Sequence, residues 1–437
     1  MRPATRHRLA AFFAAWPVIL PFAAYALWWI LGVGDFIWII AGFIIALTWV
    51  ATHGFRLPPV MLLWIMFVLW VAVSLAMTDT SGRLLGAIYR LLLYLSATAL
   101  ALHTYNHRNY LSIWRVSGAM VWFLLGMTVC GYLAMSFPEL TIRTPMAWIV
   151  PDSLASNDLI GDMIIRRTTQ WNRDAWIPQA VRPSAPFLYA NTWGNVYSLV
   201  LPFAMIYLWL AWHTAKRWWG LLVIIARVFP ALSTLNRGMF IGLGVVALWA
   251  GIQALRRGRV TIVFVSVLGL LAGVVVWFIS PSGRNFVNRI QVTNSTEDRG
   301  ELYRVTFDTA MKSPLFGFGS PRPATIPGLP SMGTQGQFWT VLYSHGVIGA
   351  ILFMGFLLWV LLLVINRKDP VGAALGGIIA ATIVETAFYG MMTGIMVTMV
   401  AVALALRPDT IINRWDRPGI SDPPASKLPH SGRKRRS

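Results

Sequence analysis

Stretches of about 20 consecutive apolar residues recur along almost the whole chain, and they restrict its fold more than any other feature. Coiled as a helix at about 1.5 Å per residue, such a stretch crosses the roughly 30 Å hydrocarbon core of a bilayer. Because lipid offers the backbone no hydrogen-bond partner, the crossings must be helices. The composition agrees, since 57% of the residues are hydrophobic and only 12% are charged. We therefore predict an all-α, polytopic integral membrane protein.

About twelve transmembrane helices are expected, over residues 9–31, 34–52, 58–77, 83–103, 116–137, 189–212, 218–236, 238–255, 260–280, 336–365, 372–388 and 391–406. The first apolar run is too long for the apolar part of a signal peptide and no small-residue cleavage site follows it, so we expect it to remain as a helix. Residues 1–411 are predicted to form one membrane domain. Residues 412–437 are predicted to form a disordered basic tail in the cytoplasm.

The net charge of +20 is most informative through its placement. Short basic segments, such as Arg256 to Arg259, alternate with segments that are poorer in lysine and arginine. The positive-inside rule then places both termini in the cytoplasm. We predict no nucleic-acid partner, because these charges are accounted for by orientation and by contact with anionic lipid headgroups.

Two long segments, 138–188 and 281–335, face the outside in this orientation. The first mixes tryptophan, isoleucine and arginine, a pattern typical of a helix that lies along the membrane interface. In the second, Ser295 or Thr296 can cap a short helix over about 297–312, which Pro314 follows. We expect function where these external loops meet the membrane.

Outside the cytoplasmic segments, almost all basic residues are arginines, with Lys312 as the exception. Arginine forks bind phosphate oxygens in pairs and stay charged, so this bias favours a phosphate-bearing ligand. The alternative is that lysine is simply scarce throughout the chain. Arg299 and Tyr303 share one face of the external helix, whereas Arg304 can pair with Asp308.

Charged residues inside the apolar spans usually face a partner or a watery cavity. Arg90 lies within the fourth span and Arg227 near the middle of the seventh. Glu385 lies at a similar depth in a later span, so we predict that Arg227 and Glu385 form an ion pair. Arg90 stays a secondary candidate for the functional site.

Several kinds of active site are not indicated by the sequence. We find no nucleophile elbow, Walker loop or HExxH metal motif. The single cysteine, Cys130, lies inside an apolar run and cannot form a disulfide within the chain. We therefore predict neither a metal site nor a cofactor.

Four motifs, taken together and in order, resemble the O-antigen ligase and Wzy-type polymerase superfamily. They are RPSAPFLYANTWGNVYSLVLP (182–202), LSTLNRGMFIGLG (232–244), RGELYRVTFDTAMKSPLFGFGS (299–320) and TQGQFWTVLYSHGVIG (334–349). The resemblance implies a metal-independent, inverting glycosyltransferase of the GT-C-like class in the bacterial inner membrane, active in polysaccharide biosynthesis. It would move a glycan from a polyprenyl (undecaprenyl-type) diphosphate to a hydroxyl of a glycan, lipid or protein acceptor, with membrane lipids around the prenyl tail.

The resemblance also implies roles for particular residues. The family arginines that contact the diphosphate correspond here to Arg182, Arg237 and Arg299, with Asn191 and Tyr303 as secondary candidates nearby. Their guanidinium groups could stabilise the charge that develops as the diphosphate departs.

The general base is the main departure from the family pattern. Family ligases often carry a His-Asn pair where this chain has Gln335 and Gly336, and glutamine cannot accept a proton at neutral pH. Candidates for the missing role include His345, Glu301 and Asp174. His345 lies about 15 Å further along the helix and is more simply interpreted as a packed, buried histidine.

Two other classes of function stay open at this stage. One is a transporter or flippase for an anionic lipid-linked sugar, although no internal repeat of the kind common in transporters stands out. The other is a non-catalytic scaffold of a polysaccharide assembly complex, which the Gln335 departure would permit.

Overall fold

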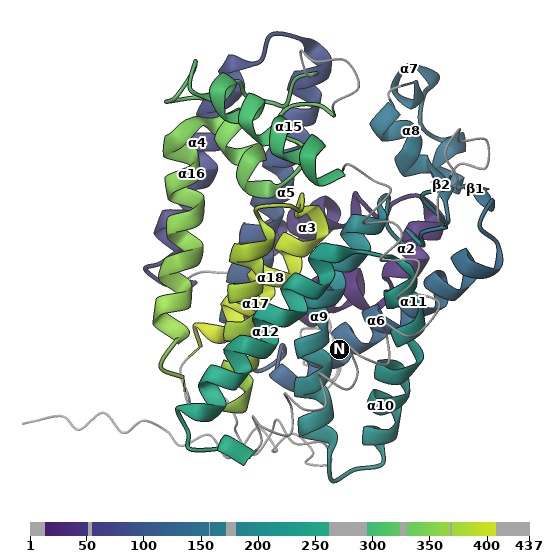
Figure 1. The fold of residues 1–437 in the computed structure, drawn as a ribbon, viewed down its shortest axis with the longest axis vertical. Coiled ribbons are helices and arrows are strands. Elements are labelled where there is room, and N and C mark those ends of the chain that lie inside the picture. The colour runs from purple at the N-terminus through teal and green to yellow at the C-terminus, as the bar shows by residue number, and fades with distance from the viewer. Residues whose placement is uncertain are drawn as a thin grey trace, which may run out of the picture.

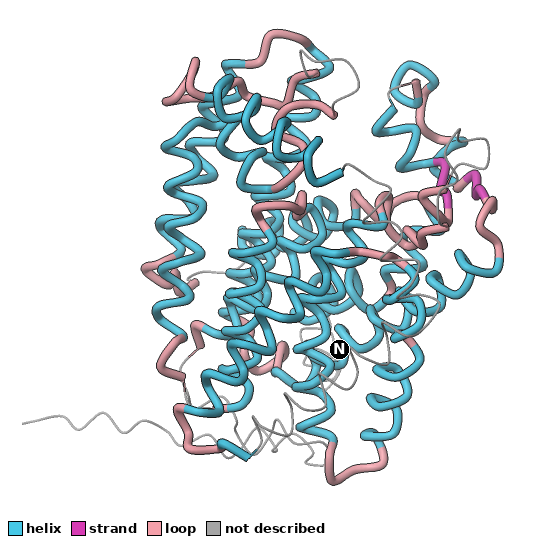
Figure 2. The backbone as a smooth tube through the Cα atoms, viewed as in Figure 1, coloured by secondary structure: helices cyan, strands magenta, loops and turns pink. Residues whose placement is uncertain are grey.

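The computed structural model describes residues 14–50, 55–156, 158–171, 181–261, 295–323, 330–367 and 369–407, and helices dominate these segments (Figures 1 and 2). After a helix over Ala14–Ala23, the α-helices that follow, apart from two short ones described below, are α2 (Tyr25–Leu31), α3 (Ile37–Val50), α4 (Met61–Ser74), α5 (Ser81–Asn106), α6 (Ile113–Ser136), α9 (Ala190–Ala211), α10 (Lys216–Ala226), α11 (Val228–Ser233), α12 (Arg237–Leu255), α15 (Ser295–Ala310), α16 (Gln337–Val364), α17 (Pro370–Glu385) and α18 (Met392–Ala405). The predicted helical fold is confirmed.

Five helices of the described segments, α5, α6, α9, α12 and α16, are long and apolar enough to cross a membrane. The helix over Ala14–Ala23 and α2 would add a sixth crossing if the pair is one bent span. Helices α3, α4, α17 and α18 are apolar but shorter. The expected number of twelve spans is therefore not confirmed, and most of the span predicted over 260–280 lies outside the described residues.

Two of the predicted spans are divided into separate helices in the structure, and a third, α16, is kinked at Gly346. The first bends by 71° between Ala23 and Tyr25. The seventh ends as α10 at Ala226 and resumes as α11, because Pro230 has no N–H to donate to the carbonyl of Ala226. The Tyr132 hydroxyl donates to that carbonyl instead, at 2.7 Å.

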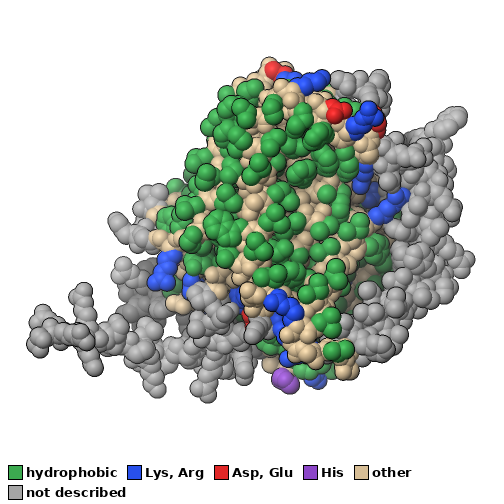
Figure 3. Space-filling view, turned by 60° about the vertical axis from the view of Figure 1, so that its left-hand side comes forward, with side chains coloured by type: hydrophobic (Ala, Val, Ile, Leu, Met, Phe, Trp, Pro, Cys, Tyr) green, Lys and Arg blue, Asp and Glu red, His purple; other side chains and the backbone are tan. Residues whose placement is uncertain are grey.

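The core of the bundle lies where several helices pack closely around α9. Helix α9 is its most enclosed spanning helix among the described residues, and α6, α12, α17 and α18 pack against it. Helix α12 approaches α17 closely because Gly376 lies beneath the indole of Trp249. Small residues permit such close contacts between membrane helices. Figure 3 shows a broad apolar face with charged side chains near its upper and lower edges, as expected for a surface that contacts lipid.

The segments predicted to be external lie together at one end of the bundle (Figure 1). The described part of 138–188 holds a two-stranded antiparallel hairpin, β1 (Thr141–Arg143) with β2 (Ile165–Arg167), in which Ile142 faces Arg166, and the short helices α7 (Asp152–Ala155) and α8 (Asp158–Ile164). The buried Arg166 anchors this hairpin through an ion pair of 2.8 Å with Asp35. The predicted helix over 297–312 is present as α15, and Arg304 lies 4.0 Å from Asp308 as expected.

Candidate functional site

A cavity of about 500 Å³ lies where helix ends from several parts of the chain meet. It is lined by the first half of α5, the starts of α9, α16 and α18, and the segments that precede them: Gly86, Tyr89, Arg90, Leu93, Tyr94, Gln170, Tyr189, Asn191, Thr192, Thr334, Gln335, Gln337, Thr340, Phe388, Tyr389, Gly390, Met391, Met392 and Ile395. Amide and hydroxyl groups converge here among apolar side chains, an arrangement typical of ligand sites.

Arg182 connects two of the predicted motifs. Its Nε donates to the carbonyl of Thr234 at 2.9 Å, and its Nη2 donates to Oδ1 of Asn191 at 3.1 Å. Thr234 belongs to the turn before α12, whereas Asn191 lines the cavity. The structure therefore brings the 182–202 motif and the 232–244 motif together at one edge of the cavity.

The turn before Arg237 is held firmly in place. Leu235 adopts a left-handed backbone conformation (φ 49°), and Asn236 caps α12 by accepting from the N–H of Met239 at 3.4 Å. Nδ2 of Asn236 donates to the carbonyl of Ala190 at 3.2 Å. Arg237, the first residue of α12, is half-buried beside this cap. Its position at a helix N-terminus adds to the local preference for an anion.

Tyr303 fixes α15 over the start of α16. Its ring stacks on Trp339 with 4.7 Å between the ring centroids, and its hydroxyl donates to the carbonyl of Gln335 at 3.1 Å. Burial raises the pKa of Tyr303, and the positive charge of Arg299, one helical turn earlier on α15, acts in the opposite direction. Arg299 is therefore presented near the cavity residue Gln335.

Tyr389 links these segments electrostatically. It is buried between α17 and α18, and its hydroxyl donates to Oδ1 of Asn236. Burial raises the pKa of Tyr389 well above its usual value, and the negative charge of Glu385 raises it further. The charges of Arg299 and Arg182 act in the opposite direction on the same phenol. Two arginines from separate segments thus influence one side chain of the cavity wall.

Gln335 lines the cavity, and the residue after it has a backbone conformation that requires glycine. Gly336 has a φ of 148°, and a Cβ there would lie 2.6 Å from the carbonyl oxygen of Ala387. Next to it, Nε2 of Gln337 donates to the Tyr94 hydroxyl at 2.6 Å, while its Oε1 accepts from the N–H of Met391 at 3.0 Å. This bridge from α16 to α5 and α18 is absent from the sequence prediction, although an amide within an apolar run was a signal for it.

Arg90 also lines the cavity. Its Nη1 lies 3.4 Å from both the carbonyl of Gly86 and Oγ of Ser320. Ser320 ends the glycine-containing turn of the third motif, which Arg83 holds against α5 by donating to the carbonyl of Phe318 at 2.7 Å. The predicted secondary candidate Arg90 therefore lies in the cavity wall, and Arg83 is an anchor that sequence reasoning missed.

The three other candidates for the general base lie elsewhere. His345 is buried between α16 and α4, where its Nδ1 lies 2.6 Å from Oγ of Ser74, and it does not line the cavity. Glu301 is exposed on α15, and Asp174 lies outside the described residues. Among these candidates and Gln335, the structure brings only Gln335 to the cavity wall in the segments that it describes.

The predicted ion pair between Arg227 and Glu385 is wrong. Glu385 accepts hydrogen bonds from Asn195 at 2.6 Å and from Ser198 at 2.5 Å, whereas the guanidinium of Arg227 lies 4.1 Å from the ring centroid of Tyr197. Similar depth misled the prediction, because the two side chains contact different faces of α9. On an α-helix, Tyr197 is about 200° from Asn195 and about 100° from Ser198.

A family model described as O-antigen ligase matches residues 222–354. The matched segment contains Arg237, Arg299 and Gln335, whereas Arg182 precedes it. The match over this segment supports the predicted family and a role in polysaccharide assembly at a membrane. No curated protein shows significant similarity to the chain.

Proposed function

We propose that this chain, which carries an O-antigen ligase domain over residues 222–354, is a glycosyltransferase of the bacterial inner membrane. It transfers a glycan from a polyprenyl diphosphate of the undecaprenyl type to an acceptor hydroxyl at the outer face. One observation carries the proposal: segments bearing Arg182, Arg237 and Arg299 meet beside a single polar cavity. The family match supports it independently.

The arginines would stabilise the leaving group. As the bond between the sugar and the diphosphate breaks, negative charge grows on the diphosphate oxygens. Thr234 holds the guanidinium of Arg182, the Asn236 cap fixes the start of the helix that carries Arg237, and Tyr303 fixes the helix that carries Arg299. Groups positioned in this way need little reorganisation to meet that charge. These groups supply positive charge of the kind that a divalent cation supplies in other transferases, so the proposed reaction is metal-independent.

The acceptor side would use the amides of the cavity wall. Gln335 and Asn191 can orient an acceptor hydroxyl by hydrogen bonds, opposite the departing diphosphate. Attack from that side in a single displacement inverts the anomeric carbon. The hydroxyl proton must go to another group; His345 and Glu301 do not line the cavity, so Asp174, in the external segment 138–188, stays the candidate.

Arginine substitutions test the diphosphate clamp. We expect Arg237→Ala and Arg299→Ala each to lower turnover of a polyprenyl-diphosphate-linked oligosaccharide by about 100-fold or more, with the purified chain in liposomes. Arg182→Lys should lose less, because the charge stays but the fork that joins Thr234 to Asn191 does not. Arg304→Ala is the matched control on α15, since that side chain is 77% exposed, and it should keep wild-type turnover.

The same liposomes separate the alternative functions. A clamp without a catalytic role would leave the Arg237→Ala and Arg299→Ala variants at wild-type turnover. Movement of the lipid-linked sugar across the bilayer without formation of product would indicate a transporter. A wild-type chain that neither transfers nor moves the donor, yet restores the surface glycan to a deletion strain, would indicate a scaffold.

A further inference from the structure

A second and larger cavity, of about 840 Å³, lies at the opposite end of the bundle from the candidate site. It is a groove between the helix over Ala14–Ala23 and α10, with α6 as its floor and α9 contributing one side chain: Ala15, Trp16, Ile19, Leu20, Ala23, Trp114, Arg115, Gly118, Ala119, Trp122, Tyr207, Lys216 and Trp219. None of these residues takes part in the proposed transfer reaction.

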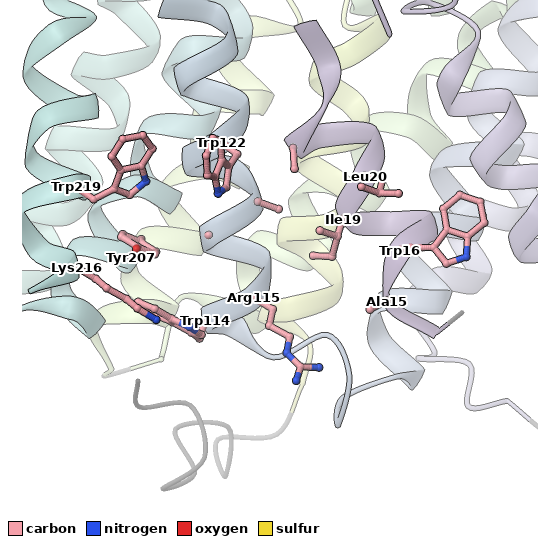
Figure 4. A pocket seen from close by; sticks show the side chains of 13 residues that line it. Ala15, Trp16, Ile19, Leu20, Trp114, Arg115, Trp122, Tyr207, Lys216 and Trp219 are labelled. Carbon is pink, nitrogen blue, oxygen red and sulfur yellow. The ribbon is translucent and has the colours of Figure 1, made fainter. Parts of the chain in front are cut away.

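The groove has a polar end and an apolar length (Figure 4). Lys216, Trp114 and Arg115 lie together at one end, whereas Trp122 and Trp219 lie further along. From Trp114 to Trp122, α6 advances by roughly 12 Å at 1.5 Å per residue. The lining is thus long enough to hold part of an extended hydrocarbon chain beneath a charged group.

Aromatic contacts build the charged end. Trp114 stacks on Tyr207 with 4.6 Å between centroids, and Nζ of Lys216 lies 5.3 Å above the Trp114 ring. Arg115 is exposed and donates from Nη1 to the carbonyl of Tyr110 at 3.1 Å. Within the described residues, neither Lys216 nor Arg115 forms an ion pair with an acidic side chain, and no acidic residue lines the groove. The charged end therefore complements an anion.

The position of the groove in the membrane indicates which kind of anion it would bind. Trp122 is 52% exposed on the bundle surface, so the groove opens toward the surrounding membrane. Basic side chains next to the interface attract anionic lipids, and tryptophan rings are favoured at that depth. We propose that this groove binds an anionic phospholipid, with the phosphate at Arg115 and Lys216 and an acyl chain along Gly118, Trp122 and Trp219.

Native mass spectrometry of the full chain in detergent tests this site, with phosphatidylglycerol and phosphatidylcholine of identical acyl chains as probes. The wild type should retain phosphatidylglycerol preferentially. We expect Arg115→Ala and Lys216→Ala each to lower that preference about fivefold, and the double variant to lose it. Arg217→Ala is the matched control, because Arg217 is adjacent to Lys216 but does not line the groove, and it should keep the preference.

A second variant blocks the acyl chain instead of the headgroup. A Cβ on Gly118 would meet only Tyr207, at 3.8 Å, so Gly118→Leu fits on α6 while filling the groove. It should lower retention of both lipids and leave the melting temperature near that of the wild type. Equal phosphatidylglycerol retention by the wild type, the double variant and Gly118→Leu would overturn the proposal. Displacement of the lipid by glycerol phosphate at equal concentration would also overturn it, since the groove would then bind an anion alone.

Discussion

At the candidate site, Tyr389 joins the α17–α18 connection to the start of α12. Its side chain is 3% exposed, and its hydroxyl satisfies Oδ1 of Asn236, the residue that caps α12. Burial raises the pKa of the phenol well above its usual value of about 10. The folded protein therefore favours the neutral phenol, and the hydrogen bond that Tyr389 donates persists throughout the neutral range.

Substitution of Tyr389 by phenylalanine should change how stability depends on pH. A raised pKa in the folded state stabilises the protein below the unfolded pKa of about 10, and that contribution is lost as the pH rises toward the folded pKa. Below pH 9, Tyr389→Phe should be less stable by about 1–3 kcal/mol, because Asn236 loses a buried donor. Above about pH 10, the two melting temperatures should converge.

Thermal unfolding in detergent between pH 7 and pH 11 measures both effects. Tyr105→Phe is a suitable control, since the Tyr105 hydroxyl makes no hydrogen bond in the part of the chain that the structure describes. Melting curves of Tyr389→Phe that run parallel to those of the wild type up to pH 11 would contradict the assigned role of the phenol.

At the residue scale, the sequence predicts which residues lie at the cavity better than it predicts which side chains they contact. Arg182, Asn191 and Arg90 were named in advance, and all three lie in or next to the cavity wall. The partner of Glu385 could not be predicted, because the depth of a residue in a span does not determine the rotation of its helix. The bridge made by Gln337 depends on the same rotation, which only tertiary packing fixes.

At the scale of the element, α12 owes its position to a glycine at its start. A Cβ on Gly238 would lie 2.5 Å from the Tyr389 hydroxyl oxygen and 2.9 Å from Cδ2 of Phe388. The end of α12 that carries Arg237 can therefore approach the α17–α18 connection only because residue 238 has no side chain. Gly244, further along the same helix, would meet nothing within 4 Å.

This contrast predicts opposite effects for two identical substitutions. Gly238→Ala should destabilise the protein by about 1–3 kcal/mol through overpacking and should displace Arg237, which lowers turnover. Gly244→Ala should be neutral or stabilise the helix by up to about 1 kcal/mol, because alanine has the higher helix propensity. Melting temperature and turnover of both variants, measured side by side, check this. Equal loss in both would show that α12 tolerates no alanine for reasons unrelated to Tyr389.

A proline inside an apolar run does not by itself fix where an element ends. The run over 189–212 forms α9 almost as expected, even though Pro202 lies inside it. The run over 218–236 is divided, since Pro230 removes a backbone donor and Tyr132, distant in sequence, compensates for it. A sequence shows the proline but not the hydroxyl that makes a break at that point favourable.

At the scale of the whole molecule, the two ends of the helix bundle carry different kinds of segment. Helix α15 and the β1–β2 hairpin lie at the end with the 500 Å³ cavity, while the basic turns after α9 and α12 lie at the other (Figure 1). The alternation of short basic segments with segments poorer in lysine and arginine predicted this separation. Which end faces the cytoplasm follows from the positive-inside rule and can be tested directly.

The chain is well suited to cysteine labelling, because its single cysteine, Cys130, is only 3% exposed inside the bundle. We expect a membrane-impermeant maleimide to leave the wild type unlabelled in intact spheroplasts and to label Arg304→Cys on α15. Arg259→Cys, in the exposed turn after α12, should react only once the membrane is permeabilised. Cys130→Ala in the same background controls for slow opening of the bundle. Labelling of Arg259→Cys in intact spheroplasts, with Arg304→Cys protected, would place the cavity on the cytoplasmic side, and transfer at the outer face would then be impossible.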